Sequence, residues 1–284
     1  MTEISAAVVK ELREKTFAGM MDCKKALQEN NGDFEAAVKW LREKGLSTAA
    51  KRSDRAASEG LIDVKFNDER SLAALLELNS ETDFVARNAK FRALLNQLLD
   101  QVLAKQPKDI AELESQPFLG DESKKINELI TDAIAVIGEN IVARRFALYS
   151  VPAGNVLESY VHNGRIGVLV ELTGAQADSE LAKNIAMHIA AANPAPQYLQ
   201  RADVTAEHLA SEREIYKTQI LQDEKNAKKP ANIIEKIIDG KVNKFYQDVC
   251  LLEQGYIRDP DKTIKDILPE GVSIVRFTRF ELGA

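Results

Sequence analysis

Cysteine, histidine and tryptophan are scarce in this sequence, which has two, three and one of them in 284 residues. Cys23 and Cys250 lie far apart and have neither metal-ligand nor redox spacing, which indicates a reducing compartment. No histidine has another histidine or a cysteine at ligand spacing, so we expect no zinc or other metal site. The histidines are His162, His188 and His208.

Long apolar runs, an excess of basic residues and glycine-rich phosphate motifs are also absent. No stretch approaches the roughly 20 apolar residues that a membrane span needs, and residues 1–4 lack the features of a signal peptide. A net charge of −6 and an isoelectric point near 5.4 argue against nucleic acid as a direct partner. With no recognisable nucleophile setting, the sequence predicts a cytoplasmic protein that has no cofactor and is not an enzyme.

The N-terminal region, residues 1–45, shows the apolar spacing of three short helices that pack on one another. The second helix is expected over residues 21–29, and Asn30-Asn31-Gly32 supplies a left-handed stop. Asp33 would cap the third helix, which we expect to end at Gly45.

After a charged linker at residues 51–58, two segments of the chain resemble one another. Each has two apolar runs joined by a polar turn, then an amphipathic helix and later a further apolar strand. The three strands of the first copy are expected at 60–66, 72–78 and 142–148. Those of the second copy are expected at 156–161, 166–172 and 274–280, with the hairpin signal Asn163-Gly164 between the first two. We predict two separate small antiparallel sheets, each covered by helices.

Two charged helices are expected between the amphipathic helix and the third strand of the second copy. They fall at 205–226 and 231–248, and Pro230 suits the first turn of the second one. Neither helix is apolar enough to be buried all round, so the pattern predicts an exposed antiparallel helical hairpin. Residues 105–125, which contain two prolines and a glycine, are interpreted as a surface excursion.

The most informative segment follows the second strand of the first copy and reads Ser80-Glu81-Thr82-Asp83-Phe84-Val85. Its polar residues favour local side-chain-to-backbone hydrogen bonds over strand pairing, which puts Phe84 at a strand-to-helix corner. Asp83 could cap the turn that follows. Two interpretations of Phe84 stay open: it folds back onto its own helix as a hydrophobic staple, or it projects outward.

Other notable residues have ordinary structural interpretations beside a functional one. His188 falls on the apolar face of its helix and is expected to be a hydrogen-bonded packing residue, whereas His208 should face water. Cys23 is expected in the small core of the three helices, and Lys24 is either a solvated charge or a contact residue. Gly138 is explained as a helix C-cap without any partner.

Five motifs stand in order along nearly the whole chain. They read Thr16-Phe17-Ala18-Gly19-Met20-Met21-Asp22-Cys23-Lys24-Lys25-Ala26-Leu27, Thr82-Asp83-Phe84-Val85, Ile137-Gly138-Glu139-Asn140, Arg165-Ile166-Gly167-Val168-Leu169-Val170 and Met187-His188-Ile189-Ala190-Ala191. Together they resemble the bacterial elongation factor Ts family, the guanine-nucleotide exchange factors of elongation factor Tu.

The resemblance implies an α+β fold in three parts. An N-terminal three-helix module similar to ubiquitin-associated domains is followed by two related α+β subdomains with small antiparallel sheets, and the second subdomain carries the inserted helical hairpin. In this sequence the three parts are expected at 1–55, 56–148 and 149–284, with the hairpin at about 204–247.

The resemblance also implies the function and its residues. The chain would promote GDP release from elongation factor Tu by disturbing its magnesium and phosphate site. The residues expected to enter that site are Thr82, Asp83, Phe84 and Val85. Further partner contacts are expected at Asp22, Lys24, Ile137, Gly138 and His162. Some members form homodimers through the later subdomain, and the sequence leaves this open.

Two departures from the family and one alternative function remain. Phe17 stands where the family commonly has glycine. Some members continue into a further C-terminal helix that touches the partner; this sequence ends at Glu281-Leu282-Gly283-Ala284, so a lower affinity is expected.

The alternative is an adaptor whose N-terminal module binds ubiquitin-like or nascent-chain partners without exchange activity. A metabolic enzyme would need a pocket of converging polar groups, for which the sequence offers no candidate.

Overall fold

The chain divides into two compact units, each described below by itself. The computed structural model describes residues 4–16, 18–223 and 229–284; Phe17 and the expected end of the helix at 224–226 therefore lie outside the described residues. The first unit contains Met1–Ser150, Asn163–Ile166 and Phe280–Ala284, and the second contains Val151–His162 and Gly167–Arg279.

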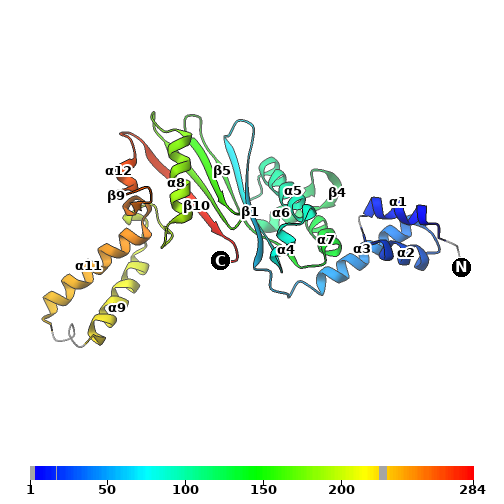
Figure 1. Cartoon of the computed structure of the whole chain (residues 1–284), viewed down its shortest axis with the longest axis horizontal. Helices are drawn as coiled ribbons and strands as arrows, with labels where there is room; N and C mark the ends of the chain where they lie inside the picture. Colours follow the sequence, from blue (N-terminus) through cyan, green and yellow to red (C-terminus); the bar gives the residue numbers. More distant parts are fainter. Residues whose placement is uncertain (1–3, 17, 224–228) are drawn as a thin grey trace. The chain divides into compact units, whose positions relative to one another are not determined.

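Three helices open the first unit (Figure 1). They are α1 (Ala6–Thr16), α2 (Met20–Glu29) and α3 (Phe34–Ala50). As predicted, the Asp33 carboxylate caps α3 by accepting the backbone N–H of Ala36 at 2.9 Å, and Asn31 and Gly32 stop α2 at positive φ. Their shared core is formed by Val9, Leu12, Cys23, Ala26, Leu27 and Ala37.

The prediction that α3 ends at Gly45 is wrong, because the helix continues to Ala50. Gly45 is buried where α3 packs on α7 (Ile126–Ile137), and a Cβ added to it would lie 3.5 Å from the Cβ of Ala135. The absent side chain allows close helix packing, which outweighs a helix-propensity penalty of about 1 kcal/mol for glycine.

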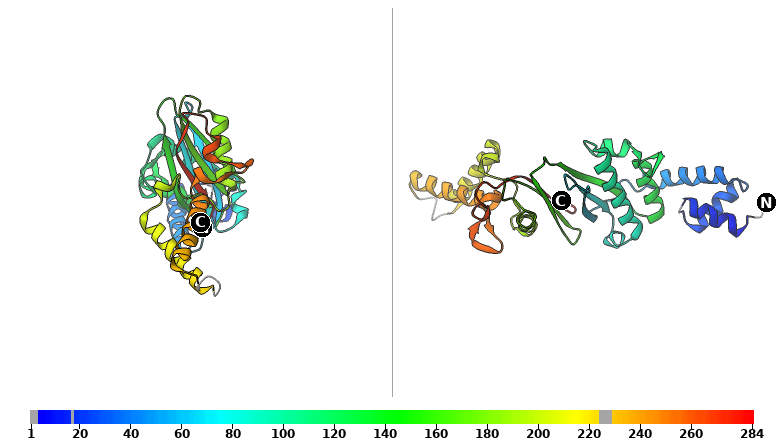
Figure 2. Two further views of the ribbon diagram at one scale, coloured as in Figure 1. Left: turned by 90° about the vertical axis from the view of Figure 1, so that its left-hand side faces the viewer. Right: turned by 90° about the horizontal axis from the view of Figure 1, so that it is seen from above.

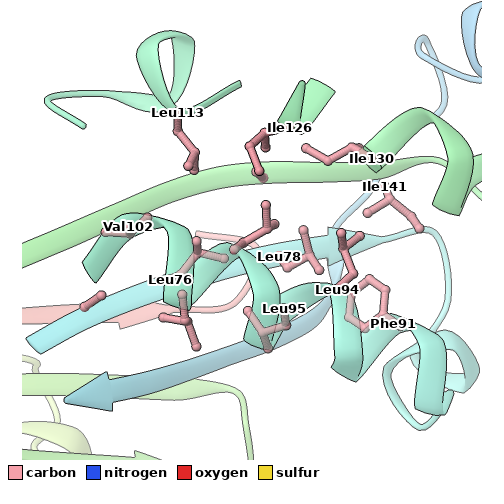
Figure 3. Packing of buried hydrophobic residues seen from close by; sticks show 14 of the residues in the cluster. Leu76, Leu78, Phe91, Leu94, Leu95, Val102, Leu113, Ile126, Ile130 and Ile141 are labelled. Carbon is pink, nitrogen blue, oxygen red and sulfur yellow. The ribbon is translucent and has the colours of Figure 1, made fainter. Parts of the chain in front are cut away.

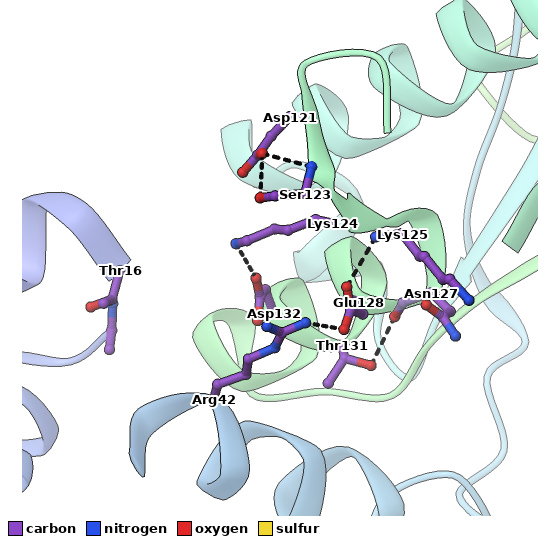
Figure 4. A network of polar contacts seen from close by, with 11 residues as sticks. Thr16, Arg42, Asp121, Ser123, Lys124, Lys125, Asn127, Glu128, Thr131 and Asp132 are labelled. Carbon is purple, nitrogen blue, oxygen red and sulfur yellow. Dashed lines mark hydrogen bonds and ion pairs between the residues drawn. The ribbon is translucent and has the colours of Figure 1, made fainter. Parts of the chain in front are cut away.

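Polar contacts join α3 and the linker after it to both ends of α7, and Figure 4 shows those at the start of the helix. Arg42 of α3 pairs with Glu128, whose other carboxylate oxygen accepts the backbone N–H of Lys125 at 3.0 Å. The pKa of Glu128 is lowered mainly by this hydrogen bond from Lys125 and, to a smaller extent, by the positive charge of Arg42. Near the other end of α7, the guanidinium of Arg52 donates to the carbonyl of Ile134 at 3.2 Å.

A three-stranded antiparallel sheet forms the centre of the first unit. Its strands are β1 (Glu59–Phe66), β2 (Leu72–Ser80) and β5 (Ile141–Ser150), with β2 in the middle. β1 and β2 pair with Glu59 opposite Ser80, and the pairing of β2 with β5 shifts between Glu77 and Leu78. One face of β2 packs against α5 (Ala89–Lys105) and α7 in a continuous apolar core (Figure 3).

The interpretation of residues 105–125 as a surface excursion is wrong in part. The segment folds into α6 (Ile110–Ser115) and a short ribbon of β3 (Pro117–Phe118) and β4 (Asp121–Lys125). Leu113 of α6 is fully buried in the core, beside Ile126 in Figure 3. The sequence pattern hides this because a six-residue helix with a single buried side chain is too short to show a detectable periodicity.

Most of a second three-stranded sheet lies in the second unit, while its hairpin turn and the end of its last strand belong to the first unit. Its strands are β6 (Val156–His162), β7 (Ile166–Thr173) and β10 (Ser273–Glu281), with β7 in the middle. Asn163 and Gly164 both take positive φ, 52° and 70°, as the predicted two-residue hairpin turn requires. Helix α8 (Ser179–Ala191) follows, and β8 (Gly255–Tyr256), β9 (Asp259–Thr263) and α12 (Ile264–Ile267) come later.

The two sheets repeat one arrangement, which confirms the predicted α+β fold with two related parts. In each, a hairpin is followed by a helix, a short ribbon, another helix and a third strand that pairs with the hairpin's second strand. The two copies also share an equivalent backbone hydrogen bond. The N–H of Ile126 donates to the carbonyl of Gln116 in the first copy, and the N–H of Ile264 donates to the carbonyl of Gln254 in the second, both at 3.0 Å.

A helical hairpin is inserted in the second copy where the first copy has α6 (Figures 1 and 2). It consists of α9 (Ala206–Gln222) and α11 (Ala231–Val249), flanked by the short 3-10 turns η1 (Arg201–Asp203) and η2 (Leu251–Glu253). Ile220 is the only side chain of α9 that is buried within the described residues, which agrees with the predicted exposure. In the same described part of the chain, no helix has both the length and the apolar character that crossing a membrane requires.

Candidate protein-binding site

Phe84 projects outward from a single turn of helix that directly follows β2. This turn, α4 (Asp83–Ala86), buries Val85 and Ala86 at 8% exposure each, whereas Phe84 is 77% exposed. A staple would bury the ring against its own helix, so that alternative is wrong. An aromatic side chain this exposed contributes little to folding, and aromatic residues are enriched among those that anchor protein interfaces.

The prediction that Asp83 caps the turn is wrong. Asp83 is the first residue of α4, and its carboxylate lies 3.8 Å from the guanidinium of Arg87 one turn later, an exposed ion pair. Thr82 holds the cap position but makes no capping bond with its side chain. Its hydroxyl instead donates to one oxygen of Glu139 at 2.6 Å, and its backbone N–H donates to the other at 2.9 Å.

A second carboxylate joins the same two segments in the opposite direction. Glu81 accepts the backbone N–H of Asn140 at 2.7 Å and pairs with Arg55 at 3.4 Å. The hydrogen bond from Asn140, with a further contribution from Arg55, lowers the pKa of Glu81. The side-chain amide of Asn140 donates to the carbonyl of Arg55 at 2.8 Å, so the linker after α3 is held at the same place.

These bonds bring two of the predicted contact regions together. Ile137 is the last residue of α7, and Gly138 ends the helix in the left-handed conformation at φ 93°, as the C-cap interpretation predicts. Glu139 follows directly and holds Thr82. The corner at Thr82–Val85 and the end of α7 at Ile137 and Gly138 therefore form one surface, although 50 residues and more separate them in the sequence.

Asp22 and Lys24 lie on α2, in the three-helix region. Asp22 is partly buried and pairs with Lys44 of α3, whereas Lys24 is exposed. Cys23 between them is fully buried, as expected, and burial raises the pKa of its thiol. Sequence reasoning missed the exposed side chains at the start of α2: Met20 is 46% and Met21 74% exposed.

The three histidines take different roles in the second unit. His188 is buried, with Nε2 3.1 Å from the Gln254 side-chain oxygen and Nδ1 accepting the backbone N–H of Ile257, which confirms the packing interpretation. The expectation that His208 faces water is wrong, since it is half-buried against Phe245 and lies 2.7 Å from the hydroxyl of Tyr198. His162 is exposed at the end of β6, with Nδ1 3.0 Å from the Tyr160 hydroxyl.

The described residues contain no group of three or more His, Cys, Asp or Glu side chains arranged to hold a metal ion. What the first unit offers instead is an exposed aromatic side chain on a turn held by carboxylates.

Comparison with known proteins gives the family. The sequence pattern of the family described as elongation factor TS matches residues 81–284. Elongation factor Ts of Trichlorobacter lovleyi is 48% identical, with 99% of this chain and 93% of the relative covered. Those of Syntrophotalea carbinolica and Halothermothrix orenii are 48% and 46% identical, over 99% of this chain and 93% and 92% of the relatives. The chain belongs to the elongation factor Ts family.

Membership makes the chain a translation elongation factor, in agreement with the resemblance seen in its motifs. The match to the elongation factor Ts pattern begins at Glu81, so it includes the whole corner with Phe84 and its holder Glu139. The three-helix region lies outside that match but within the aligned part of the elongation factor Ts relatives.

Proposed function

We propose that this chain is a guanine-nucleotide exchange factor for elongation factor Tu and accelerates GDP release without bond chemistry. A protein that binds the empty partner more tightly than the GDP-bound partner must weaken GDP binding by the same factor. It needs only a surface that favours a distorted nucleotide pocket. Family membership supports this partner, and a translation factor of this kind acts in the cytoplasm.

The observation that carries the proposal is the exposure of Phe84 on a turn whose other apolar residues are buried. Inserted into the partner near its magnesium site, the ring would separate the elements that hold the ion and the phosphates. The magnesium charge is a large part of what retains GDP. Thr82 and Val85 hold the turn on its own unit, and Asp83 adds a negative charge beside the ring.

Further contacts complete the proposed interface. Ile137 and Gly138 adjoin the corner through Glu139, so they would meet the partner beside Phe84. Asp22 and Lys24 would meet it from the three-helix module, and His162 from the second subdomain. We further propose that the chain is divided into three parts at about 1–55, 56–148 and 149–284, and that each part makes its own contact with elongation factor Tu.

Stopped-flow release of fluorescently labelled GDP from elongation factor Tu tests the function. With magnesium present, adding the chain should raise the dissociation rate of GDP, whereas an adaptor would leave it unchanged. After excess chelator has removed the magnesium, the acceleration should shrink greatly, because the ion that Phe84 displaces is already gone. Equal acceleration in both conditions would contradict a route through the magnesium site.

A further inference from the structure

Two carboxylates, Glu139 after α7 and Glu81 at the corner, hold the Phe84 corner to the end of α7. Glu139 accepts both the hydroxyl and the backbone N–H of Thr82, at 2.6 and 2.9 Å, and Glu81 accepts the backbone N–H of Asn140 at 2.7 Å. We name these two reciprocal contacts the carboxylate clasp. Hydrogen bonds to an ionised carboxylate are stronger than those between neutral groups.

The corner has little else to set its direction. Helix α4 has only four residues, and an isolated helical turn is not stable by itself. It lacks a side-chain cap, since the hydroxyl of Thr82 points to Glu139 rather than to the turn. Val85 and Ala86 bury the inner side of α4, which keeps the turn on the core, and the Ser80 hydroxyl donates to the Thr82 carbonyl at 3.0 Å, but it is the clasp that ties Thr82 to the end of α7.

We propose that Glu139 is a positioning residue for nucleotide exchange, acting through Thr82 to set the angle at which Phe84 meets the partner. The inference rests on the proposed exchange function and adds a residue to it. The C-cap Gly138 places Glu139 directly after α7, and α7 is packed against α3 and the core. The rigid helix thus supplies the reference to which the exposed ring is held.

A purely structural role makes a different prediction. If the clasp only stabilised the fold, breaking it would lower the melting temperature, and the folded fraction would exchange normally. If it positions Phe84, the folded protein would bind GDP-bound partner normally yet release GDP slowly. The measurement must therefore separate stability, initial binding and the maximal release rate.

Glu139→Gln breaks one of the two bonds that Glu139 accepts from Thr82, with little change of shape, because the amide nitrogen of the glutamine cannot accept a hydrogen bond. Asp266→Asn is the matched control: the Asp266 carboxylate accepts the backbone N–H and the hydroxyl of Thr263, at 2.9 and 2.7 Å, in the second unit. Both variants replace a carboxylate that accepts two hydrogen bonds from a threonine by an amide, but only Glu139 touches the corner.

We expect Glu139→Gln to lower the maximal GDP release rate at saturating chain by about tenfold, since misplacing a positioned group by an ångström is known to have effects of this order and larger. Asp266→Asn should exchange like the wild type. Thr82→Val should also be slow, and its effect should not add to that of Glu139→Gln, because both substitutions remove the same contact. Hydrogen exchange should show lost protection at the Thr82 amide in Glu139→Gln.

Phe84→Ala, measured in the same series, separates the two proposals. If Phe84→Ala is slow while Glu139→Gln releases GDP at the wild-type rate, the positioning role is overturned and the exchange function stands. A Glu139→Gln variant that melts lower but exchanges normally when folded likewise overturns the positioning role alone. A wild-type chain that does not accelerate GDP release overturns both proposals.

Discussion

At the scale of single residues, each sheet contains a buried glutamate that neutralises an arginine. Glu77 on β2 is fully buried and accepts from Arg145 at 2.7 Å, and Glu171 on β7 accepts from Arg276 at 2.6 Å. Glu77 also accepts the backbone N–H of Gly283 at 3.0 Å, which ties the C-terminal residues of the first unit to its sheet. A buried carboxylate with this many donors is stabilising only as long as its partners remain.

Glu77→Gln should lower the free energy of unfolding by about 2–3 kcal/mol, below the usual cost of breaking a buried pair because Arg145 retains some contact with water. Urea denaturation measures this change. Glu14→Gln, which removes an exposed pair with Lys10, serves as the control and should change stability by less than about 0.5 kcal/mol. Equal effects of the two substitutions would contradict the buried role of Glu77.

The lowered pKa of the buried His188 predicts that the stability of the protein depends on pH. Burial lowers its pKa below the ordinary 6.5, so between 6.5 and the lowered pKa the unfolded chain binds a proton that the folded chain does not. The contribution of His188 to the free energy of unfolding is therefore complete above pH 6.5. It is lost as the pH falls from 6.5 through the lowered pKa, by at most about 1.4 kcal/mol per pH unit.

Urea unfolding measures the free energy of unfolding at about pH 7.5 and at about pH 5.5. Between these two pH values His188→Gln should lose less of that free energy than the wild type does. The comparison uses the difference between the two pH values, because the substitution also changes the packing against Gln254 and Ile257. Identical pH dependence in both proteins would show that His188 titrates in the folded state as it does in the unfolded chain.

Residue-level sequence reasoning succeeded where the signal is local. The burial of Cys23 and the C-cap at Gly138 follow from neighbouring residues and turn chemistry, whereas the residues around Phe84 left its exposure open and only the family resemblance favoured it. It failed at Thr82, because the partner Glu139 lies 57 residues away and no local pattern pairs them. The expectation that Asp83 caps the turn failed because α4 begins at Asp83 itself, which leaves the cap position to Thr82.

At the scale of elements, helix α7 connects the parts of the proposed site. Its first turn is bound to Arg42 of the three-helix region, and its last turn leads through Gly138 to Glu139. The sequence predicted neither the extension of α3 beyond Gly45 nor α6, since both depend on packing against α7 or the core. The strands and the hairpin turns were predictable because their apolar runs and the Asn163-Gly164 signal are local.

Deleting residues 1–50 should raise the Kd for elongation factor Tu by about tenfold, the equivalent of about 1.4 kcal/mol, because the contacts at Asp22 and Lys24 are lost. The remaining chain should still fold, since no buried residue of the core around β2 and α5 comes from α1, α2 or α3, and of these helices only α3 packs against it, through the partly buried Ala49. Circular dichroism checks the fold and titration calorimetry the affinity. Unaltered affinity would remove the three-helix module from the interface.

At the scale of the whole molecule, one structural plan is used twice and carries different additions. The first copy presents the exposed turn α4, and the second carries the hairpin of α9 and α11 where the first has α6. The two sheets form the stable framework of the molecule, whereas the proposed function depends on the elements that each copy adds to its sheet. Sedimentation of the isolated chain would determine whether the second copy also forms a homodimer, which the sequence leaves open.

GDP release by Phe84→Ala, with its melting temperature, tests the central claim most directly. Because Phe84 is 77% exposed, the variant should melt within a few degrees of the wild type, yet it should release GDP from elongation factor Tu clearly more slowly at saturating concentration. A variant that melts much lower but exchanges normally while folded would show that the side chain belongs to the core. Release at the wild-type rate with unchanged melting would show that Phe84 is not the group that opens the nucleotide site.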